Sequence, residues 1–149
     1  MHMHSFKPSQ VQRGVAIIEF AITLPLLLLL LLAIAEFGRM LYQYNILLQA
    51  SRDAGRYVSG QAWNRTLGKI DLTSDLKAKA QTVAFFSVPS SLVVGSVVEV
   101  TQVEEDSEHI QVSITRTFVP LIGNGIPSFI GDGVALNLPL VATTVMRVL

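Results

Sequence analysis

The chain contains no cysteine, and this absence excludes disulfide bonds, thiolate metal sites and a cysteine nucleophile. Charge is also scarce: 15% of the residues are charged, and 11 basic side chains balance 11 acidic ones. Without net charge, the chain has no global field that would draw it onto nucleic acid. Outside the cytoplasm, such a domain has to be stabilised by packing, by a membrane or by partner proteins.

The sequence also lacks recognisable catalytic motifs. No serine lies in a GxSxG nucleophile motif. The glycines of Gly123–Gly125 and Gly131–Gly133 are typical of turns and not of phosphate-binding loops. The acidic stretch Glu104–Glu108, followed by His109, offers ligands for a hard cation but lacks EF-hand spacing, which favours a solvated hairpin turn. The sequence therefore predicts a protein that is not an enzyme and has no cofactor, no metal site and no small-molecule substrate.

Hydrophobic residues make up half of the chain and are concentrated near the N-terminus. The segment Phe20–Ala35 carries no charge, and Leu26–Leu32 is an unbroken run of leucine. A membrane-spanning helix needs about 20 mainly apolar residues. We therefore expect a transmembrane helix over residues 15–37, with Pro25 inside it.

Basic residues determine the expected orientation of this helix. Lys7 and Arg13 lie in a short polar segment, residues 1–14, that precedes the span. The positive-inside rule keeps this leader in the cytoplasm and places everything after Arg39 on the other side of the membrane.

Beyond the span, the helical pattern continues over residues 38–59, where no proline interrupts it. Apolar residues at Leu47, Ala50, Ala54 and Tyr57 recur with spacings of three and four, which places them on one helix face. This face is either a helix-packing surface for assembly or the core-facing side of the chain's own domain. For a small domain the core-facing interpretation is favoured.

The remaining residues, 60–149, are expected to form a small extracytoplasmic domain. Asp71–Ser87 has the apolar spacing of a short second helix, with Asp71 or Thr73 as its N-cap. Three later segments are strand-like, the first two of them alternating apolar and polar residues: 97–103, 109–119 and 140–148. The predicted fold class is α+β, with a long N-terminal transmembrane helix continuing outward, a short second helix and an antiparallel sheet of about three strands.

Glu19 is the most informative single residue, because a carboxylate inside an apolar span is costly unless it is paired. A cut after Gly14 would give Val15 a free amine with a positive charge. This amine could pair with Glu19 of the same chain or of a neighbour, and between chains the pair would set the axial register of packed helices. If the span begins after Glu19 instead, the carboxylate lies among the lipid headgroups.

The residues around Glu19 resemble a known processing site. The run Arg13-Gly14-Val15-Ala16-Ile17-Ile18-Glu19-Phe20 is similar to the cleavage site of class III prepilin-like proteins. The similarity continues in the family's order through three further segments: Leu24-Pro25-Leu26, Glu36–Arg39 and Ala50–Arg56. Together these motifs resemble the TadE-like family, which are pseudopilins of the tight-adherence (Flp) pilus system.

The resemblance implies a substrate motif for another enzyme. A membrane aspartyl prepilin peptidase would cut between Gly14 and Val15, with glycine allowing close approach to the backbone, and Glu19 would serve processing or assembly. It further implies a single-pass minor pilin of the bacterial inner membrane with a periplasmic C-terminal domain. The implied partners are other pilins or pseudopilins and the pilus export machinery. TadF subunits and small TadG-like anchors stay as alternatives, and no acidic residue follows Met146-Arg147 as is frequent in the family.

A competing motif is present at Ala33-Ile34-Ala35, which has the small-x-small form of an ordinary signal-peptidase site. Cleavage after Ala35 would leave a secreted soluble binding protein that begins at Glu36. Against this, the apolar stretch is longer than the usual core of about 7–15 residues. A third alternative is a membrane-tethered accessory domain that keeps its leader.

Overall fold

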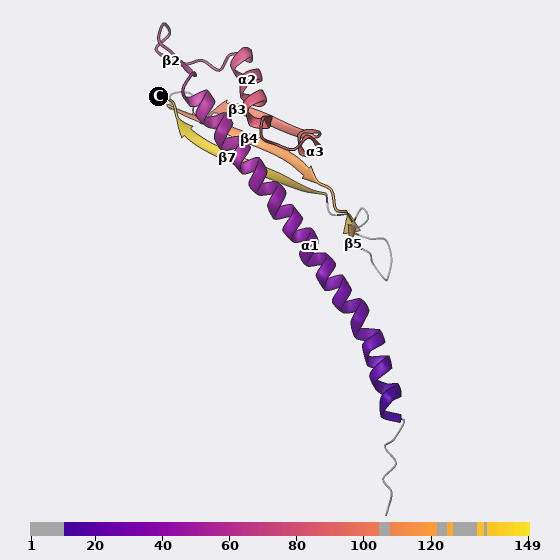
Figure 1. Cartoon of the computed structure of the whole chain (residues 1–149). Coiled ribbons are helices and arrows are strands. Elements are labelled where there is room, and N and C mark those ends of the chain that lie inside the picture. The colour runs from indigo at the N-terminus through magenta and orange to yellow at the C-terminus, as the bar shows by residue number, and fades with distance from the viewer. Residues whose placement is uncertain (1–10, 105–107, 122–124, 127–133, 136) are drawn as a thin grey trace, which may run out of the picture. The chain divides into compact units, whose positions relative to one another are not determined.

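The computed structural model describes residues 11–104, 108–121, 125–126, 134–135 and 137–149 (Figure 1). The chain divides into two compact units, Met1–Gly38 and Arg39–Leu149. Helix α1, Val11–Ser59, contributes to both units and continues through Pro25. Its residues beyond Gly38 therefore belong to the same folded unit as the sheet.

Three strands form the main sheet of the C-terminal unit: β3 (Ser96–Gln102), β4 (His109–Phe118) and β7 (Leu138–Arg147). They are antiparallel in the order β3-β4-β7, as Figure 1 shows. The alternation predicted along β4 is confirmed, because every second side chain over most of the strand is buried: Ile110, Val112, Ile114 and Phe118. The observed combination of helices and small antiparallel sheets confirms the predicted α+β class.

The buried face of the sheet packs against the second half of α1. The most deeply buried positions of this helix form one stripe: Leu47, Ala50, Ser51, Ala54 and Val58. Ser51 Oγ lies 2.8 Å from Thr144 Oγ1 on β7. Next to this contact, a Cβ added to Gly55 would meet the sulfur of Met146 at 3.1 Å. Small side chains on α1 thus allow the close approach of helix and sheet.

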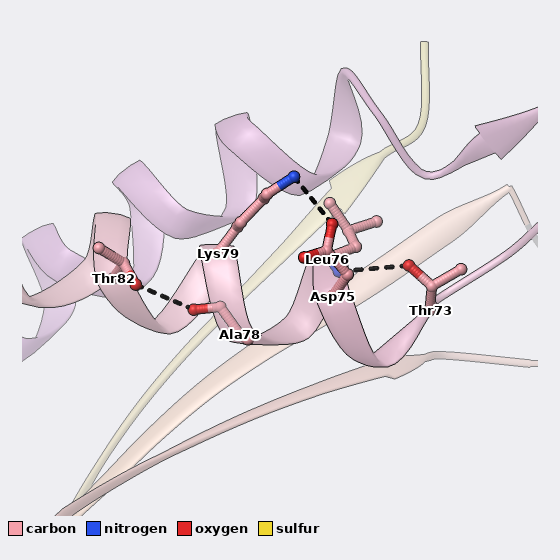
Figure 2. Close-up of polar contacts among 6 residues, drawn as sticks. All are labelled: Thr73, Asp75, Leu76, Ala78, Lys79 and Thr82. Atoms are coloured by element: carbon pink, nitrogen blue, oxygen red, sulfur yellow. Dashed lines mark hydrogen bonds and ion pairs between the residues drawn. The ribbon is translucent and has the colours of Figure 1, made fainter.

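Helix α2, Ser74–Phe85, begins after Thr73, whose Oγ1 accepts a hydrogen bond from the Leu76 amide at 3.2 Å (Figure 2). Thr73 is therefore the N-cap, and the helix is shorter than predicted because the residues before Thr73 are not helical. The hydrogen bond and the charge of Asp75, 2.8 Å away, raise the pKa of Lys79, but both side chains are exposed and such pairs stabilise little. The buried residues of α2 join the core: Leu76, Ala80 and Ala84.

Short elements lie between the longer helices and strands. Strand β1 (Trp63–Asn64) pairs with β2 (Lys69–Ile70), and β5 (Gly125–Ile126) pairs with β6 (Val134–Ala135). A single helical turn, α3 (Ser90–Val93), follows α2. Strands of two residues are too short to display alternation, so these elements have no pattern that sequence analysis could detect.

We predict that Thr73→Ala destabilises the C-terminal unit by about 1 kcal/mol, because the amide of Leu76 loses its cap acceptor. The melting temperature of the full chain in detergent, followed by circular dichroism, should fall by about 4 °C. Thr73→Ser keeps the hydroxyl and is the control. Equal melting temperatures for Thr73→Ala and the parent chain would contradict the capping role.

We also predict that Ala50→Leu destabilises the same unit by about 1–3 kcal/mol, since this fully buried position has no room for a larger side chain. The control is Gln49→Leu, one position earlier on the exposed side of α1, which should change stability by less than about 0.5 kcal/mol. Denaturant unfolding of both variants in detergent measures the difference. Similar losses at the two positions would contradict the close packing of α1 on the sheet.

Candidate functional site

The predicted processing residues lie in the first half of α1. Gly14 is helical, and a Cβ added to it would meet nothing within 4 Å. The described fold therefore sets no requirement for glycine here, either by space or by a positive φ angle.

Val15 and Glu19 are both exposed and lie one helical turn apart. A spacing of four residues places them on the same face of α1, with a rise of about 6 Å between their Cα atoms. The backbone carbonyl of Glu19 accepts a hydrogen bond from Thr23 Oγ1 at 2.9 Å. Among the residues that the structure describes, none forms an ion pair with the Glu19 carboxylate. The described part of the chain therefore supplies no cation that pairs with this carboxylate.

The surface of α1 over residues 15–37 is apolar on nearly every side. Its large side chains are exposed, among them Ile17 at 68%, Phe20 at 63% and Leu30 at 57%. Within the described ranges, α1 is the one helix that is long and apolar enough to cross a membrane. This surface far exceeds the apolar patches of soluble monomers and suits the hydrocarbon of a bilayer.

The predicted helix-packing face lies in the second half of α1. Leu47, Ala50 and Ala54 are fully buried in the core of their own unit, and Tyr57 is half-buried beside it. These side chains contribute to the contact of α1 with the rest of the C-terminal unit. Sequence analysis did not single out Ser51 and Gly55, although the small pairs Ala50-Ser51 and Ala54-Gly55, four residues apart, are a detectable pattern of close helix approach.

Arg39 has a role that sequence analysis did not assign. Its Nη2 donates a hydrogen bond to the carbonyl oxygen of Val119 at 2.6 Å, and its guanidinium carbon lies 4.8 Å from the ring centroid of Phe118. Arg39 therefore links the start of the C-terminal unit to the end of β4. The motif Glu36–Arg39 pointed to this region without indicating the contact.

The described residues of the acidic turn, Glu104 and Glu108, are not grouped with other side chains that could bind a metal ion. Glu108 forms an ion pair with Arg147, while residues 105–107 lie outside the described ranges. Across the described chain, no three His, Asp or Glu side chains are placed to hold one metal ion. The glycine turns at 123–124 and 131–133 also lie outside the described residues.

An open cavity of ≈ 360 Å³ lies between the β1–β2 hairpin and α2. Four of its polar side chains form two pairs. Asn64 Nδ2 donates to Asp71 Oδ2 at 3.1 Å, and Asp75 binds Lys79 at 2.8 Å. The first contact fixes Asn64 of the hairpin to Asp71, and the second lies within α2.

Comparison with known families gives a match that lies within α1. Residues 14–56 match the family model described as TadE-like protein. The matched segment begins at Gly14 and ends three residues before α1 does, so it contains Glu19, Arg39 and the buried stripe as far as Ala54, but not the sheet. No match is found among curated proteins or solved structures. The resemblance to the TadE-like family is thereby confirmed over residues 14–56.

Proposed function

We propose that this chain is a minor pilin of the tight-adherence pilus system, anchored in the inner membrane by α1 and matured by a prepilin peptidase. The TadE-like match over residues 14–56 carries the proposal, because it begins at the proposed cut site. As a pseudopilin, the protein would help to initiate, prime or cap the pilus, or align its export machinery. It would act through helix packing and not through catalysis.

The anchoring step is supported by the exposed apolar surface over residues 15–37. The positive-inside rule, applied to Lys7 and Arg13, puts residues 1–14 in the cytoplasm and the C-terminal unit in the periplasm. In this orientation the cut between Gly14 and Val15 lies at the cytoplasmic side of the membrane, within reach of a membrane-embedded peptidase.

The processing step is supported by the open space around Gly14. Since the chain's own packing leaves room for a side chain, a need for glycine would arise when the protease approaches the backbone. Gly14 lies in helical backbone, so the peptidase would have to open the first turn of α1 to reach the peptide bond. Glycine makes this opening less costly because it is the weakest helix former after proline.

The assembly step centres on Glu19. After cleavage, the new amine of Val15 would lie about 6 Å along the helix axis from Glu19. In hydrocarbon, a carboxylate is stable when it is paired with an opposite charge. A pair formed between neighbouring chains would satisfy both charges and fix the axial register of their helices, while the small residues of the span permit close approach.

Gly14→Leu should leave most of the protein uncut in its native host, because a large side chain blocks approach to the backbone. Intact mass and N-terminal sequencing of protein from native membranes measure the cut. The control is Gly38→Leu, at a second helical glycine whose surroundings are equally open, and this variant should be processed normally.

The same N-terminal measurement on the parent chain separates the alternatives. A mature chain that begins at Val15 agrees with the proposal. A soluble chain beginning at Glu36 would instead establish a secreted protein, and an uncut chain in cells with active peptidase would favour a tethered accessory domain.

Glu19→Gln should leave membrane insertion unchanged and lower the number of pili several-fold, because the neutral amide keeps the shape of the side chain but removes its charge. Carbonate extraction measures insertion, and electron microscopy of a strain that depends on this gene measures piliation. Glu19→Asp keeps the charge and should retain more activity than the amide. Normal piliation by Glu19→Gln would exclude the charge pair.

A further inference from the structure

The two ends of the three-stranded sheet differ in chemistry. Near the start of β4 and the end of β7, Glu108 and Arg147 form an exposed ion pair, beside which the apolar side chains of Val145 and Leu149 are also exposed. Near the end of β4 and the start of β7, no ion pair is found among the described residues, and three large apolar side chains are exposed: Val119, Leu121 and Leu138. Ten residue pairs of the β4–β7 ladder separate these ends, which corresponds to about 30 Å.

Arg39 identifies the apolar end as the one where the chain enters the C-terminal unit. Its guanidinium group binds the Val119 carbonyl and lies over Phe118. Arg39 also follows the apolar segment 15–37 after a single residue, Gly38. The point at which the chain leaves this segment is therefore adjacent to the apolar end of the sheet. In the next turn of α1, Leu41 and Tyr42 are exposed as well.

From this arrangement we infer that the apolar end of the sheet lies in the interface of the same bilayer that holds α1. The contact surface, which we name the basal patch, consists of five exposed residues: Leu41, Tyr42, Val119, Leu121 and Leu138. The inference rests on the proposed membrane anchoring of α1. The ligand is the boundary between lipid headgroups and acyl chains.

The composition of the basal patch suits this boundary. Apolar side chains of interfacial segments enter the headgroup and acyl region to a depth of about 5–10 Å. Tyrosine is enriched at membrane–water interfaces, where its ring lies at the level of the headgroups. Leu121 is the most exposed member of the patch at 77%, and contact with lipid would remove this apolar surface from water. The charged end of the sheet would stay in water.

Leu149 provides a matched control at the charged end. It is 90% exposed, and its backbone amide binds the carbonyl oxygen of Ser59 at 3.1 Å. Arg39 and Ser59 are separated by about 30 Å along α1. Leu121 and Leu149 are thus two exposed leucines at opposite ends of one folded unit, and the inference assigns lipid contact to the first and water to the second.

Because the chain has no cysteine, a single introduced cysteine can carry an environment-sensitive fluorophore such as NBD. Leu121→Cys, Leu149→Cys and Leu30→Cys are each labelled in the full chain and reconstituted into vesicles of phosphatidylethanolamine and phosphatidylglycerol. All three positions are exposed, so the core is left intact. The probe at Leu121 should show a blue-shifted emission and several-fold stronger quenching by shallow nitroxide lipids than the probe at Leu149. The probe at Leu30 should be quenched by deep nitroxide lipids.

The three probes separate failure of the basal contact from failure of the anchor. Water-like emission at Leu121 together with deep quenching at Leu30 would overturn the basal contact and leave the anchor intact. Equal shielding at Leu121 and Leu149 would also overturn it, because the contact would not be specific to one end of the sheet. Absence of quenching at Leu30 would remove α1 from the bilayer, and both the anchor and the basal contact would fall.

Discussion

The close packing of α1 against the sheet is the interaction on which the C-terminal unit depends, since the chain has no disulfide that could hold it together. Protein cores are packed as densely as organic crystals, and a gap between helix and sheet would forfeit many weak contacts at once. Ala50, Ala54 and Gly55 keep the two elements close. At the same level, the hydroxyls of Ser51 and Thr144 satisfy each other, so burial of these polar groups is not costly.

One helix presents two kinds of surface, and the change occurs near Arg39. Before it, over residues 15–37, α1 is apolar on nearly every side, as a helix in lipid is. After it, a narrow stripe of small buried residues faces the sheet, while Arg52, Asp53 and Arg56 are exposed. The TadE-like match covers both surfaces and stops before the sheet. The family pattern therefore describes the helix, whose two halves have different surfaces, and does not include the sheet.

Local patterns were predictable from the sequence, whereas contacts between distant residues were not. The alternation along β4 and the cap at Thr73 are visible within a few neighbouring residues, and the motif around Gly14 and Glu19 is linear. In contrast, the Ser51–Thr144 contact joins residues 93 positions apart, and the Arg39–Val119 contact joins residues 80 apart. Gly55 illustrates the reason: glycine inside a helix is unfavourable by local propensity, and its use becomes clear only with the Met146 sulfur in place.

Contacts along α1 make its second half and the sheet one mechanical body. Arg39 binds the Val119 carbonyl at one end, Ser51 meets Thr144 midway, and the amide of Leu149 binds the Ser59 carbonyl at the other end. Because these contacts are spread over about 30 Å, the helix cannot slide along its axis or rotate against the sheet without breaking at least one of them. No flexible linker separates Arg39 from the core, since the helix is continuous from there to Ser59. A force applied to the chain at Arg39 is therefore transmitted directly to the sheet.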